Sequence, residues 1–407
     1  MKKKVLLRAP LLTMSGYGVH SRQIFRWLES RSDQYDFSVN TLPWGNTSWL
    51  IDSNKLNGLI GRIMNKSGKS KDGYDISIQV QLPNEWDPSL AKFNVGVTAA
   101  VETDKANPSW LNNVNSMDMI IVPSEHSKKS LLNAGSVNKR IEVVPEAFID
   151  EIKEEELVTL PEFGTKFNFL IFGQITGQNA EDDRKNTYNT IKWLCELFKK
   201  DKDVGIVIKT NSARNCLFDR ERTKDILNNI LKNIRGENNL PPVYFIHGDM
   251  NDKEVASLYR HPQIKALVAL TKGEGFGLPI LEAAASGLPV IATNWSGHLD
   301  FMEKGKFLKV DYDLKEIPKT KIDKRKCPVC QNGCTVCSGT GFTQIFVEGS
   351  KWAEPKEKSA KSIIKKFREM PDTPKEWAEK LATTIREEYS QEAIQNHYDL
   401  VFSDIAV

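Results

Sequence analysis

Two glutamates in the second half of the chain are spaced so that both carboxylates can reach one ligand. Glu274 lies in a loop after the apolar run that ends at Leu270, and Glu282 lies about one turn into the helix that Pro279 opens. A proline fits the first turn of a helix, because the amide that it lacks would have no partner there. A carboxylate accepts two hydrogen bonds at once, which suits a pair of sugar hydroxyl groups.

The loop that carries Glu274 also has the features of a phosphate site. Its glycines, Gly273, Gly275 and Gly277, allow the backbone to approach a ligand closely. The free amides at the start of the helix that follows can hold an anion. This short stretch therefore predicts groups for phosphate beside groups for sugar hydroxyls.

The stretch Lys272–Ala283 and its continuation Gly287–Gly297 carry a family resemblance. They resemble the Glu-x7-Glu region of retaining GT-B glycosyltransferases, specifically glycosyltransferase family 4 (glycosyl transferases group 1). The resemblance implies that Glu282 binds the ribose hydroxyls of a nucleotide and that Glu274 contacts the transferred sugar. It further implies that the sugar and diphosphate lie near the backbone of Gly275, Phe276, Gly277 and Leu278. The alternative interpretation is a helix start with incidental acidic residues.

Two adjacent basic residues, Arg184 and Lys185, follow the apolar run Phe169–Phe172 after a glycine and a polar loop. A leaving diphosphate gains negative charge in the transition state, and fixed cations beside it lower the barrier. The family has an arginine and a lysine at this strand-to-helix junction, which makes both residues candidates by resemblance. Many members separate the two, so Lys209, at the end of the next predicted strand, is the alternative lysine. A solvated helix start is the other interpretation of these charges.

A glycine-rich turn near the N-terminus, with Gly16 and Gly18, opens a predicted helix and has anion-binding geometry. In GT-B enzymes this loop faces the donor diphosphate, so the resemblance makes both glycines candidates for donor binding. Glu102 follows the predicted strand Asn94–Thr98, in a position to orient or deprotonate an acceptor hydroxyl. Capping of a helix is the alternative role for this glutamate.

The resemblance implies a reaction that retains the anomeric configuration. In such enzymes the acceptor attacks on the face that the diphosphate leaves, and a leaving phosphate oxygen takes the acceptor proton. No protein nucleophile is expected, and no catalytic divalent metal is expected either, because Arg184 and Lys185 replace it. The Asp-x-Asp sequence at Asp311–Asp313 is predicted to be a loop, not the metal site that this motif forms in another glycosyltransferase fold.

Four of the six cysteines form two C-x2-C pairs: Cys327, Cys330, Cys334 and Cys337. No export signal is predicted, so the cluster indicates a metal rather than disulfides. Four thiolates satisfy a zinc ion in a closed tetrahedral site, which predicts structural zinc. Free thiols and an iron–sulfur cluster are the alternatives. The end of the cluster looks like a single cysteine-rich repeat of J-domain-type chaperones.

The chain has 407 residues, of which 40% are hydrophobic and 27% charged, and its net charge is +3. This length is typical of two domains, and the composition is that of a soluble globular protein. The small net charge is weak evidence about partners, because a protein that binds a nucleic-acid backbone usually has a stronger basic excess, clustered on one face. No apolar run is long enough to cross a membrane, and the start at Met1–Leu7 lacks the pattern of a signal peptide. A cytoplasmic location is therefore expected.

Short apolar runs alternate with longer amphipathic segments, which predicts an α/β protein with parallel sheets. Strands are expected at Val5–Arg8, Phe37–Asn40, Ile76–Val80, Asn94–Thr98, Met119–Val122, Ile141–Val144, Phe167–Phe172, Gly205–Lys209, Val243–Ile246, Ala266–Leu270 and Val290–Thr293. Helices are expected at Val19–Glu29, Ser127–Ala134, Thr187–Lys199, Lys224–Ile234, Asp252–Tyr259, Pro279–Ser286, Lys356–Met370, Pro374–Tyr389 and Gln391–Val401. The expected fold is GT-B, with two Rossmann-like doubly wound domains facing across a ligand-binding cleft.

The domains are expected to follow one another along the chain. An N-terminal, acceptor-side domain covers residues 1–155, and a donor-binding domain covers residues 160–388 with a cysteine-rich insert at 315–345. The acidic stretch Asp150–Pro161 between them is predicted to be a linker. Residues 389–407 are expected to form a helix that returns to the first domain.

The sequence as a whole predicts a retaining hexosyl- or pentosyltransferase that moves a sugar from a nucleotide-sugar donor to a hydroxyl acceptor. The alternatives are a GT-B epimerase or phosphorylase, or a non-catalytic GT-B scaffold whose zinc module binds nucleic acid or protein. The acceptor stays open among polysaccharide, lipid, protein and modified DNA. The stretch Gln79–Trp86 looks like sequences carried by large tailed phages, which suggests a phage-encoded enzyme that acts in the host cytoplasm.

Overall fold

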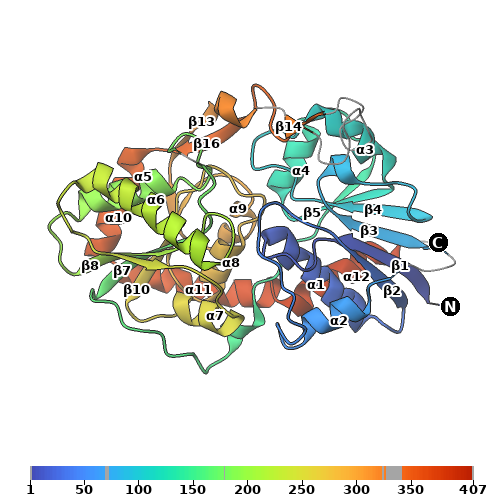
Figure 1. The fold of residues 1–407 in the computed structure, drawn as a ribbon, viewed down its shortest axis with the longest axis horizontal. Helices are drawn as coiled ribbons and strands as arrows, with labels where there is room; N and C mark the ends of the chain where they lie inside the picture. Colours follow the sequence, from blue (N-terminus) through green and yellow to red (C-terminus); the bar gives the residue numbers. More distant parts are fainter. Residues whose placement is uncertain (1, 69–72, 178, 323–324, 327–341, 406–407) are drawn as a thin grey trace. The chain divides into compact units, whose positions relative to one another are not determined.

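A computed structural model of the chain describes residues 2–68, 73–177, 179–322, 325–326 and 342–405 (Figure 1). The chain forms two compact units, and each unit draws on separate stretches of sequence. The first unit comprises Met1–Ala147, Lys319–Lys351 and Gln391–Val407. The second unit comprises Phe148–Pro318 and Trp352–Ser390.

A six-stranded parallel sheet forms the centre of the first unit, in the order β2-β1-β3-β4-β5-β6. The strands are β1 (Lys3–Ala9), β2 (Tyr35–Thr41), β3 (Ile76–Val80), β4 (Phe93–Val97), β5 (Met119–Val122) and β6 (Arg140–Val143). A parallel strand covered on both faces has buried side chains on both sides, and every residue of β3 and β5 is buried. The stretches predicted as strands at Ile76–Val80 and Met119–Val122 are thus inner strands of this sheet.

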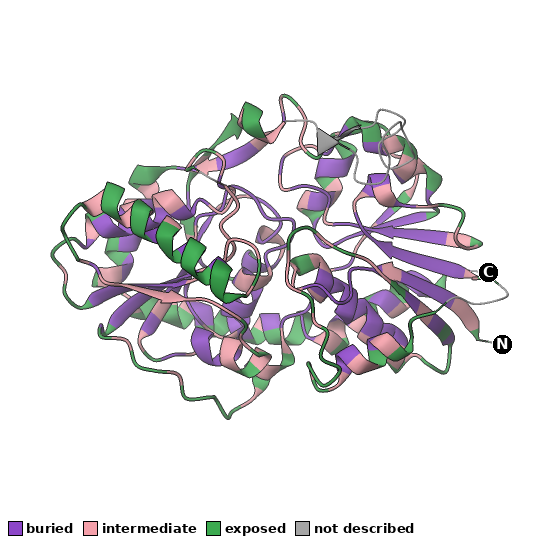
Figure 2. Cartoon of the chain, in the orientation of Figure 1, coloured by how far each residue is buried: buried purple, intermediate pink, exposed green. Residues whose placement is uncertain are grey.

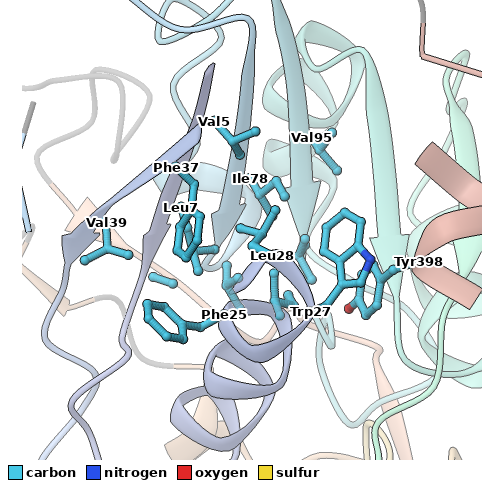
Figure 3. Packing of buried hydrophobic residues seen from close by; sticks show 14 of the residues in the cluster. Val5, Leu7, Phe25, Trp27, Leu28, Phe37, Val39, Ile78, Val95 and Tyr398 are labelled. Carbon is cyan, nitrogen blue, oxygen red and sulfur yellow. The ribbon is translucent and has the colours of Figure 1, made fainter. Parts of the chain in front are cut away.

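Helices cover both faces of this first sheet. One face packs against α1 (Gly16–Ser30), α2 (Leu59–Asn65) and α12 (Gln391–Ser403). The other face packs against η2 (Pro108–Trp110), α3 (Leu111–Ser116) and α4 (Glu125–Leu132), and η1 (Pro83–Glu85) follows β3. Figure 3 shows Trp27 of α1 beside Tyr398 of α12. Their ring centroids are 5.0 Å apart. The C-terminal helix therefore completes the core of the first unit.

A second six-stranded parallel sheet forms the centre of the second unit, in the order β12-β11-β10-β7-β8-β9. The strands are β7 (Phe167–Phe172), β8 (Val204–Lys209), β9 (Val243–Ile246), β10 (Ile264–Ala269), β11 (Val290–Thr293) and β12 (Leu308–Val310). From β7 the chain adds β8 and then β9 in one direction along the sheet. It then returns to β10, beside β7, and adds β11 and β12 in the opposite direction, so the strand order reverses between β7 and β10. Ligands of doubly wound sheets bind at the carboxyl ends of such strands.

Alternate residues of β7 enter two different cores. Phe169 and Ile171 pack against α5 (Thr187–Leu197), α6 (Leu217–Arg235) and α10 (Glu357–Glu369). Leu170 packs on the opposite face, whose helices are α7 (Asp252–Tyr259), α8 (Leu278–Ala285), α9 (Leu299–Met302) and α11 (Asp372–Glu388). Figure 2 shows the strands of both sheets largely buried, whereas α6 exposes a long outer face. The predicted α/β class with two doubly wound parallel sheets is confirmed.

Two short segments differ from the sequence-based expectations. The predicted linker contains η3 (Asp150–Lys153), whose Ile152 is buried in the core of the second unit. The predicted loop at Asp311–Asp313 is wrong in part, because Tyr312 begins β13 (Tyr312–Glu316). Asp313 lies 2.9 Å from the ammonium of Lys356 and is therefore one half of an ordinary ion pair.

The insert leaves and rejoins the fold through paired strands. β13 pairs with β16 (Lys351–Pro355), and between them lie η4 (Lys319–Lys321), β14 (Arg325–Lys326) and β15 (Phe342–Thr343). β14 pairs antiparallel with β15. The four cysteines predicted to bind zinc lie between β14 and β15 in sequence, outside the described residues.

Candidate active site

The loop between β10 and α8 carries Glu274, and the loop after β11 braces it. The amide of Glu274 donates to Oγ of Ser296 at 2.9 Å, and the amide of Gly297 donates to the carbonyl of Glu274 at 3.0 Å. Gly277 has a φ of 105°, and a Cβ there would lie 3.2 Å from Cβ of His298. Only glycine adopts this conformation readily. The loop after β11 thus holds the backbone of Glu274 through both its amide and its carbonyl.

The carboxylate of Glu274 lies between the two predicted cations. Its Oε1 is 2.7 Å from Nζ of Lys185, and its Oε2 is 3.2 Å from Nη1 of Arg184. The same Nη1 donates to the carbonyl of Gly273 at 2.6 Å. The structure therefore brings together the first glutamate of the motif and the adjacent arginine and lysine, although the two segments are 89 residues apart in sequence.

Charge balance makes this cluster attractive to an anion. Burial alone would raise the pKa of Glu274, but Lys185 and Arg184 outweigh burial and lower that pKa to about 2. The carboxylate is therefore ionised at neutral pH, and the three side chains carry one negative and two positive charges. Their net positive charge favours binding of phosphate oxygens.

The cluster borders a pocket at the carboxyl ends of β7 and β10. The walls of the pocket include Gly173 after β7, Thr271 and Glu274 after β10, Lys185, and Pro279 at the start of α8. A Cβ on Gly173 would lie 3.6 Å from Cε of Lys185, so the glycine leaves room for the lysine side chain. The pocket lies at the reversal of strand order, where doubly wound sheets bind their ligands.

The loop that displays the two cations is organised by Asp183, which is buried. Its Oδ1 accepts from Oγ1 of Thr176 at 2.7 Å and from the amide of Lys185 at 3.2 Å. Its Oδ2 accepts from the amide of Thr187, the first residue of α5, at 2.6 Å. One carboxylate thus holds both ends of the turn that contains Arg184 and Lys185.

The second glutamate of the motif, Glu282, has a different environment. It is buried on α8, and the hydroxyl of Tyr259 donates to its Oε2 at 3.1 Å. Burial raises the pKa of Glu282 to about 8, although the hydrogen bond from Tyr259 lowers it. In the free protein this carboxyl group is therefore largely protonated at neutral pH.

The alternative lysine, Lys209, does not join the cluster around Glu274. Its Nζ donates to the carbonyl of Gly248 at 2.6 Å, on the β8–β9 side of the sheet. Burial lowers the pKa of Lys209, and Asp249 partly offsets this effect. Lys185 is thus the lysine that lies at the pocket.

The glycine-rich turn of the first unit contains one glycine that packing requires and one that faces open space. The amide of Gly18 donates to Oγ of Ser15, the residue that caps α1, at 3.0 Å. A Cβ on Gly18 would lie 2.1 Å from the carbonyl oxygen of Thr13, whereas a Cβ on Gly16 would meet nothing within 4 Å. Gly16 is therefore the glycine whose backbone is open to a ligand.

Glu102 lies in the loop after β4 and is half-buried. It is close enough to Tyr17 to affect that residue: burial raises the pKa of Tyr17, and the negative charge of Glu102 adds to the increase. The hydroxyl of Tyr17 lies 3.0 Å from Oγ1 of Thr98 and accepts a hydrogen bond from the amide of Ala99. Glu102 thus lies at the carboxyl edge of the first sheet.

No metal centre is formed by the part of the chain that the structure describes: no cluster of three or more histidine, cysteine, aspartate or glutamate side chains is suited to hold an ion there. Cys327, Cys330, Cys334 and Cys337 lie outside that part, so the zinc prediction stays a prediction. The other cysteines, Cys195 and Cys216, are free thiols.

The sequence analysis did not identify several residues that shape this site. Asp183 stands directly before the two cations and close to the helix start at Thr187, which is a capping signal that the sequence contains. Ser296 lies in the quoted continuation of the motif, but nothing in its spacing links it to Glu274. Tyr259 is 23 residues from Glu282, and no local pattern connects them.

Comparisons with known proteins agree with this architecture. Residues 224–322 match the family described as Glycosyl transferases group 1, and this range contains Glu274, Glu282 and Tyr259. No curated protein matches the chain in sequence.

Solved glycosyltransferase structures resemble the chain over its whole length. A glycosyltransferase from Rickettsia africae has a TM-score of 0.64 at 13% identity, and the alignment covers 99% of this chain and 98% of that one. HepE of Anabaena, in complex with UDP and glucose, has a TM-score of 0.60 at 12% identity, with 99% and 100% covered. Sucrose-phosphate synthase of Thermosynechococcus elongatus has a TM-score of 0.61 at 12% identity, with 99% and 98% covered.

The chain therefore has the GT-B fold, and its residues 224–322 match the glycosyl transferases group 1 family. At these low identities the structural likeness establishes the fold. Within the described residues, no helix combines the length and hydrophobicity needed to span a lipid bilayer.

Proposed function

We propose that the chain is a retaining glycosyltransferase that moves a sugar from a nucleoside diphosphate sugar to an acceptor hydroxyl. The observation that carries this proposal is the cluster of Glu274, Lys185 and Arg184, of which Glu274 and Lys185 line the pocket at the carboxyl ends of β7 and β10. Two cations and one carboxylate are held there beside the start of α8. Pro279 has no amide hydrogen and the amide of Ile280 donates to the carbonyl of Gly277 at 2.9 Å, so the amides before Pro279 are the ones proposed to meet an anion. A diphosphate needs the cations and amides, and a sugar hydroxyl needs the carboxylate.

Each residue of the cluster has a specific role in this proposal. Lys185 and Arg184 bind the diphosphate and stabilise the charge that develops as the glycosidic C1–O bond breaks. Glu274 accepts hydrogen bonds from hydroxyls of the transferred sugar. The acceptor oxygen forms its new bond to C1 on the face that the diphosphate leaves, and a phosphate oxygen takes the acceptor proton. The products are the glycosylated acceptor and the nucleoside diphosphate.

Glu282 binds the two ribose hydroxyls in the proposed complex. Its carboxyl group is buried and already accepts a hydrogen bond from Tyr259. Hydrogen bonds from two hydroxyl groups stabilise the ionised form, so ribose binding is expected to favour loss of the proton from this group. Gly16 of the first unit and the backbone of Gly275 to Leu278 are the further proposed donor contacts, and Glu102 is proposed to orient the acceptor hydroxyl.

The experiment that tests the proposal has two stages. A panel of nucleoside diphosphate sugars is screened for thermal stabilisation of the full chain, starting with UDP-glucose because the HepE structure contains UDP and glucose. A ligand at a hundred times its dissociation constant stabilises a protein by about 2.7 kcal/mol. Release of free nucleotide from the stabilising donor is then measured for the wild type and for Arg184→Ala.

A matched control is Arg62→Ala, because Arg62 forms an exposed ion pair with Glu29 at 2.8 Å in the first unit. Arg184→Ala is expected to lower turnover more than about tenfold, which corresponds to ~1.4 kcal/mol, whereas Arg62→Ala leaves it unchanged. The proposal fails if no sugar nucleotide stabilises the chain, or if Arg184→Ala retains turnover. A phosphorylase would instead require inorganic phosphate, and a binding scaffold would show salt-sensitive nucleic-acid binding without donor consumption.

The four cysteines of the insert are proposed to hold a structural zinc ion, because two C-x2-C pairs supply four thiolates. The cytoplasmic location and the phage origin stay predictions from the sequence. The acceptor stays open among the classes named above.

A further inference from the structure

The side chain of Lys272 is almost completely buried next to Glu274, with 1% of it exposed, and the proposed chemistry makes no use of it. Its ammonium donates to the carbonyls of Ala180 at 2.8 Å and Glu181 at 3.1 Å. It also lies 3.0 Å from Oε2 of Glu354 and 5.2 Å from the centroid of the Trp352 ring. All three protons of the ammonium therefore have acceptors, and an aromatic face adds a further favourable contact.

These contacts attach Lys272 to the loop that displays the cations. Ala180 and Glu181 open the stretch that ends in Arg184 and Lys185. The amide of Lys272 also donates to the carbonyl of Arg184 at 2.8 Å, so the residue holds that stretch at two points. On its other side, the carbonyl of Lys272 accepts a hydrogen bond from the amide of Ala353 in β16 at 2.8 Å.

The burial of a charged group is costly unless its partners compensate, so a buried lysine indicates a specific task. We propose that Lys272 is a positioning residue, whose ammonium holds the loop of Arg184 and Lys185 in place beside Glu274. This inference rests on the proposed function, in which those two cations stabilise the leaving diphosphate. Cations that are fixed before the reaction need no reorganisation while charge develops, and this preorganisation is where Lys272 contributes.

The test compares Lys272→Met with Lys304→Met in the full chain. Methionine keeps an unbranched apolar stem and removes the ammonium. Lys304 is a matched control, because it also combines an ion pair, to Glu388 at 2.6 Å, with a ring contact, to Tyr389 at 5.9 Å. Two readouts are used: tryptic cleavage after Arg184 and Lys185, located by mass spectrometry, and the separate kcat and KM for the donor.

Lys272→Met is expected to speed cleavage at these two sites several-fold, with cleavage elsewhere unchanged. It is also expected to lower kcat by about tenfold or more, with a smaller change in the donor KM, because the fixed cations matter most as charge develops. Lys304→Met is expected to change neither readout. If Lys272→Met does not fold, Lys272→Gln is measured with the same expectations.

The inference is overturned if Lys272→Met keeps wild-type kcat and wild-type resistance to cleavage in this loop. It is also overturned if both variants lose activity and resistance alike, because that result would reflect general destabilisation. A wild type that consumes no donor would contradict the proposed function, and the cleavage pattern would still decide whether Lys272 holds the loop.

Discussion

Nζ of Lys185 lies 2.7 Å from Oε1 of Glu274, so the cation proposed for the leaving diphosphate is held by the carboxylate proposed for the sugar. A diphosphate that binds Lys185 must share this ammonium with the carboxylate. The ion pair keeps the lysine in position before the donor arrives. The same carboxylate also repels the phosphate oxygens, because like charges are brought close together.

Glu274→Gln is therefore expected to separate binding from turnover. The neutral amide no longer repels an anion, so inorganic pyrophosphate should bind about tenfold more tightly, a gain of ~1.4 kcal/mol. Donor turnover should fall, because the carboxylate that contacts the sugar is lost. Isothermal titration with pyrophosphate measures the first effect. The control is Glu303→Gln, which alters an exposed ion pair with Lys309. Weaker pyrophosphate binding to Glu274→Gln than to wild type would contradict this reasoning.

The stability of the protein should depend on the ionisation of Glu274. Its pKa in the folded protein, about 2, is lower than its ordinary value of 4.5. A lowered pKa gives a stabilising contribution that is present above pH 4.5 and lost as the pH falls toward 2. The shift corresponds to about 3 kcal/mol. Urea unfolding should show that Glu274→Gln lowers the free energy of unfolding at pH 7 and lowers it less toward pH 3. A loss of unfolding free energy that does not depend on pH would argue against the two ion pairs.

Glu282 should have the opposite dependence on pH. Its pKa in the folded protein, about 8, is higher than its ordinary value of 4.5. Its contribution to stability is therefore most favourable below pH 4.5 and is lost as the pH rises through 8. Glutamine resembles the protonated acid, so Glu282→Gln should unfold at a higher temperature than wild type at pH 9 and at a similar temperature at pH 5.

The partner of Glu282 provides a second variant for the same experiment. The hydroxyl of Tyr259 donates to the carboxyl group and lowers its pKa. Tyr259→Phe removes this hydrogen bond, so it should destabilise the protein more at pH 9, where the carboxylate needs a donor, than at pH 5. If Tyr259→Phe lowers the unfolding temperature equally at pH 9 and at pH 5, the tyrosine contributes only by packing.

The two glycines of the first-unit turn should respond differently to alanine. A Cβ on Gly18 would lie 2.1 Å from the carbonyl oxygen of Thr13, so Gly18→Ala forces the backbone to move and should cost roughly 1–3 kcal/mol. A Cβ on Gly16 would meet no atom within 4 Å, so Gly16→Ala should leave stability unchanged. Thermal unfolding compares the two variants. If Gly16 is a donor contact, its alanine variant should still weaken donor binding.

The zinc prediction has a direct elemental test. Four thiolates in a closed site bind one zinc ion, so the purified full chain should contain one zinc per molecule. Cys327→Ser together with Cys330→Ser removes half of the ligands and should abolish stoichiometric zinc. Cys216→Ser, which changes an exposed free thiol, is the control. Iron in place of zinc would support the iron–sulfur alternative.

Most of the sheet architecture could be predicted because the strands are parallel and covered on both faces. Most residues of such strands are apolar, and β3, β5, β7 and β11 have the predicted bounds. The edge strand β9 also has the predicted bounds, although all of its residues are partly exposed. The strands β12, β13, β14, β15 and β16 were not predicted. β12 has only three residues, and β13 consists mostly of exposed polar residues, so neither has an apolar run.

The site could be predicted only in part, and for a physical reason. Residues within a continuous motif, such as Glu274 and Glu282, are identified by their spacing. Arg184 and Lys185 were candidates by resemblance, but their ion pairs with Glu274 were not predicted. The hydrogen bond from Tyr259 to Glu282 was not predicted either, because such contacts form through tertiary packing that leaves no local pattern. The sequence analysis predicted that Glu282 binds the ribose of a sugar nucleotide. It could not show that, without a ligand, the carboxyl group of Glu282 accepts a hydrogen bond from the hydroxyl of Tyr259.

The most direct test of the account is a crystal structure of the full chain with the sugar nucleotide that stabilises it. The account predicts diphosphate oxygens within hydrogen-bond distance of Lys185 and Arg184, ribose hydroxyls on Glu282, and the sugar beside Glu274. A nucleotide bound elsewhere, with Lys185 still paired to Glu274 and Glu282 still bonded only to Tyr259, would contradict it.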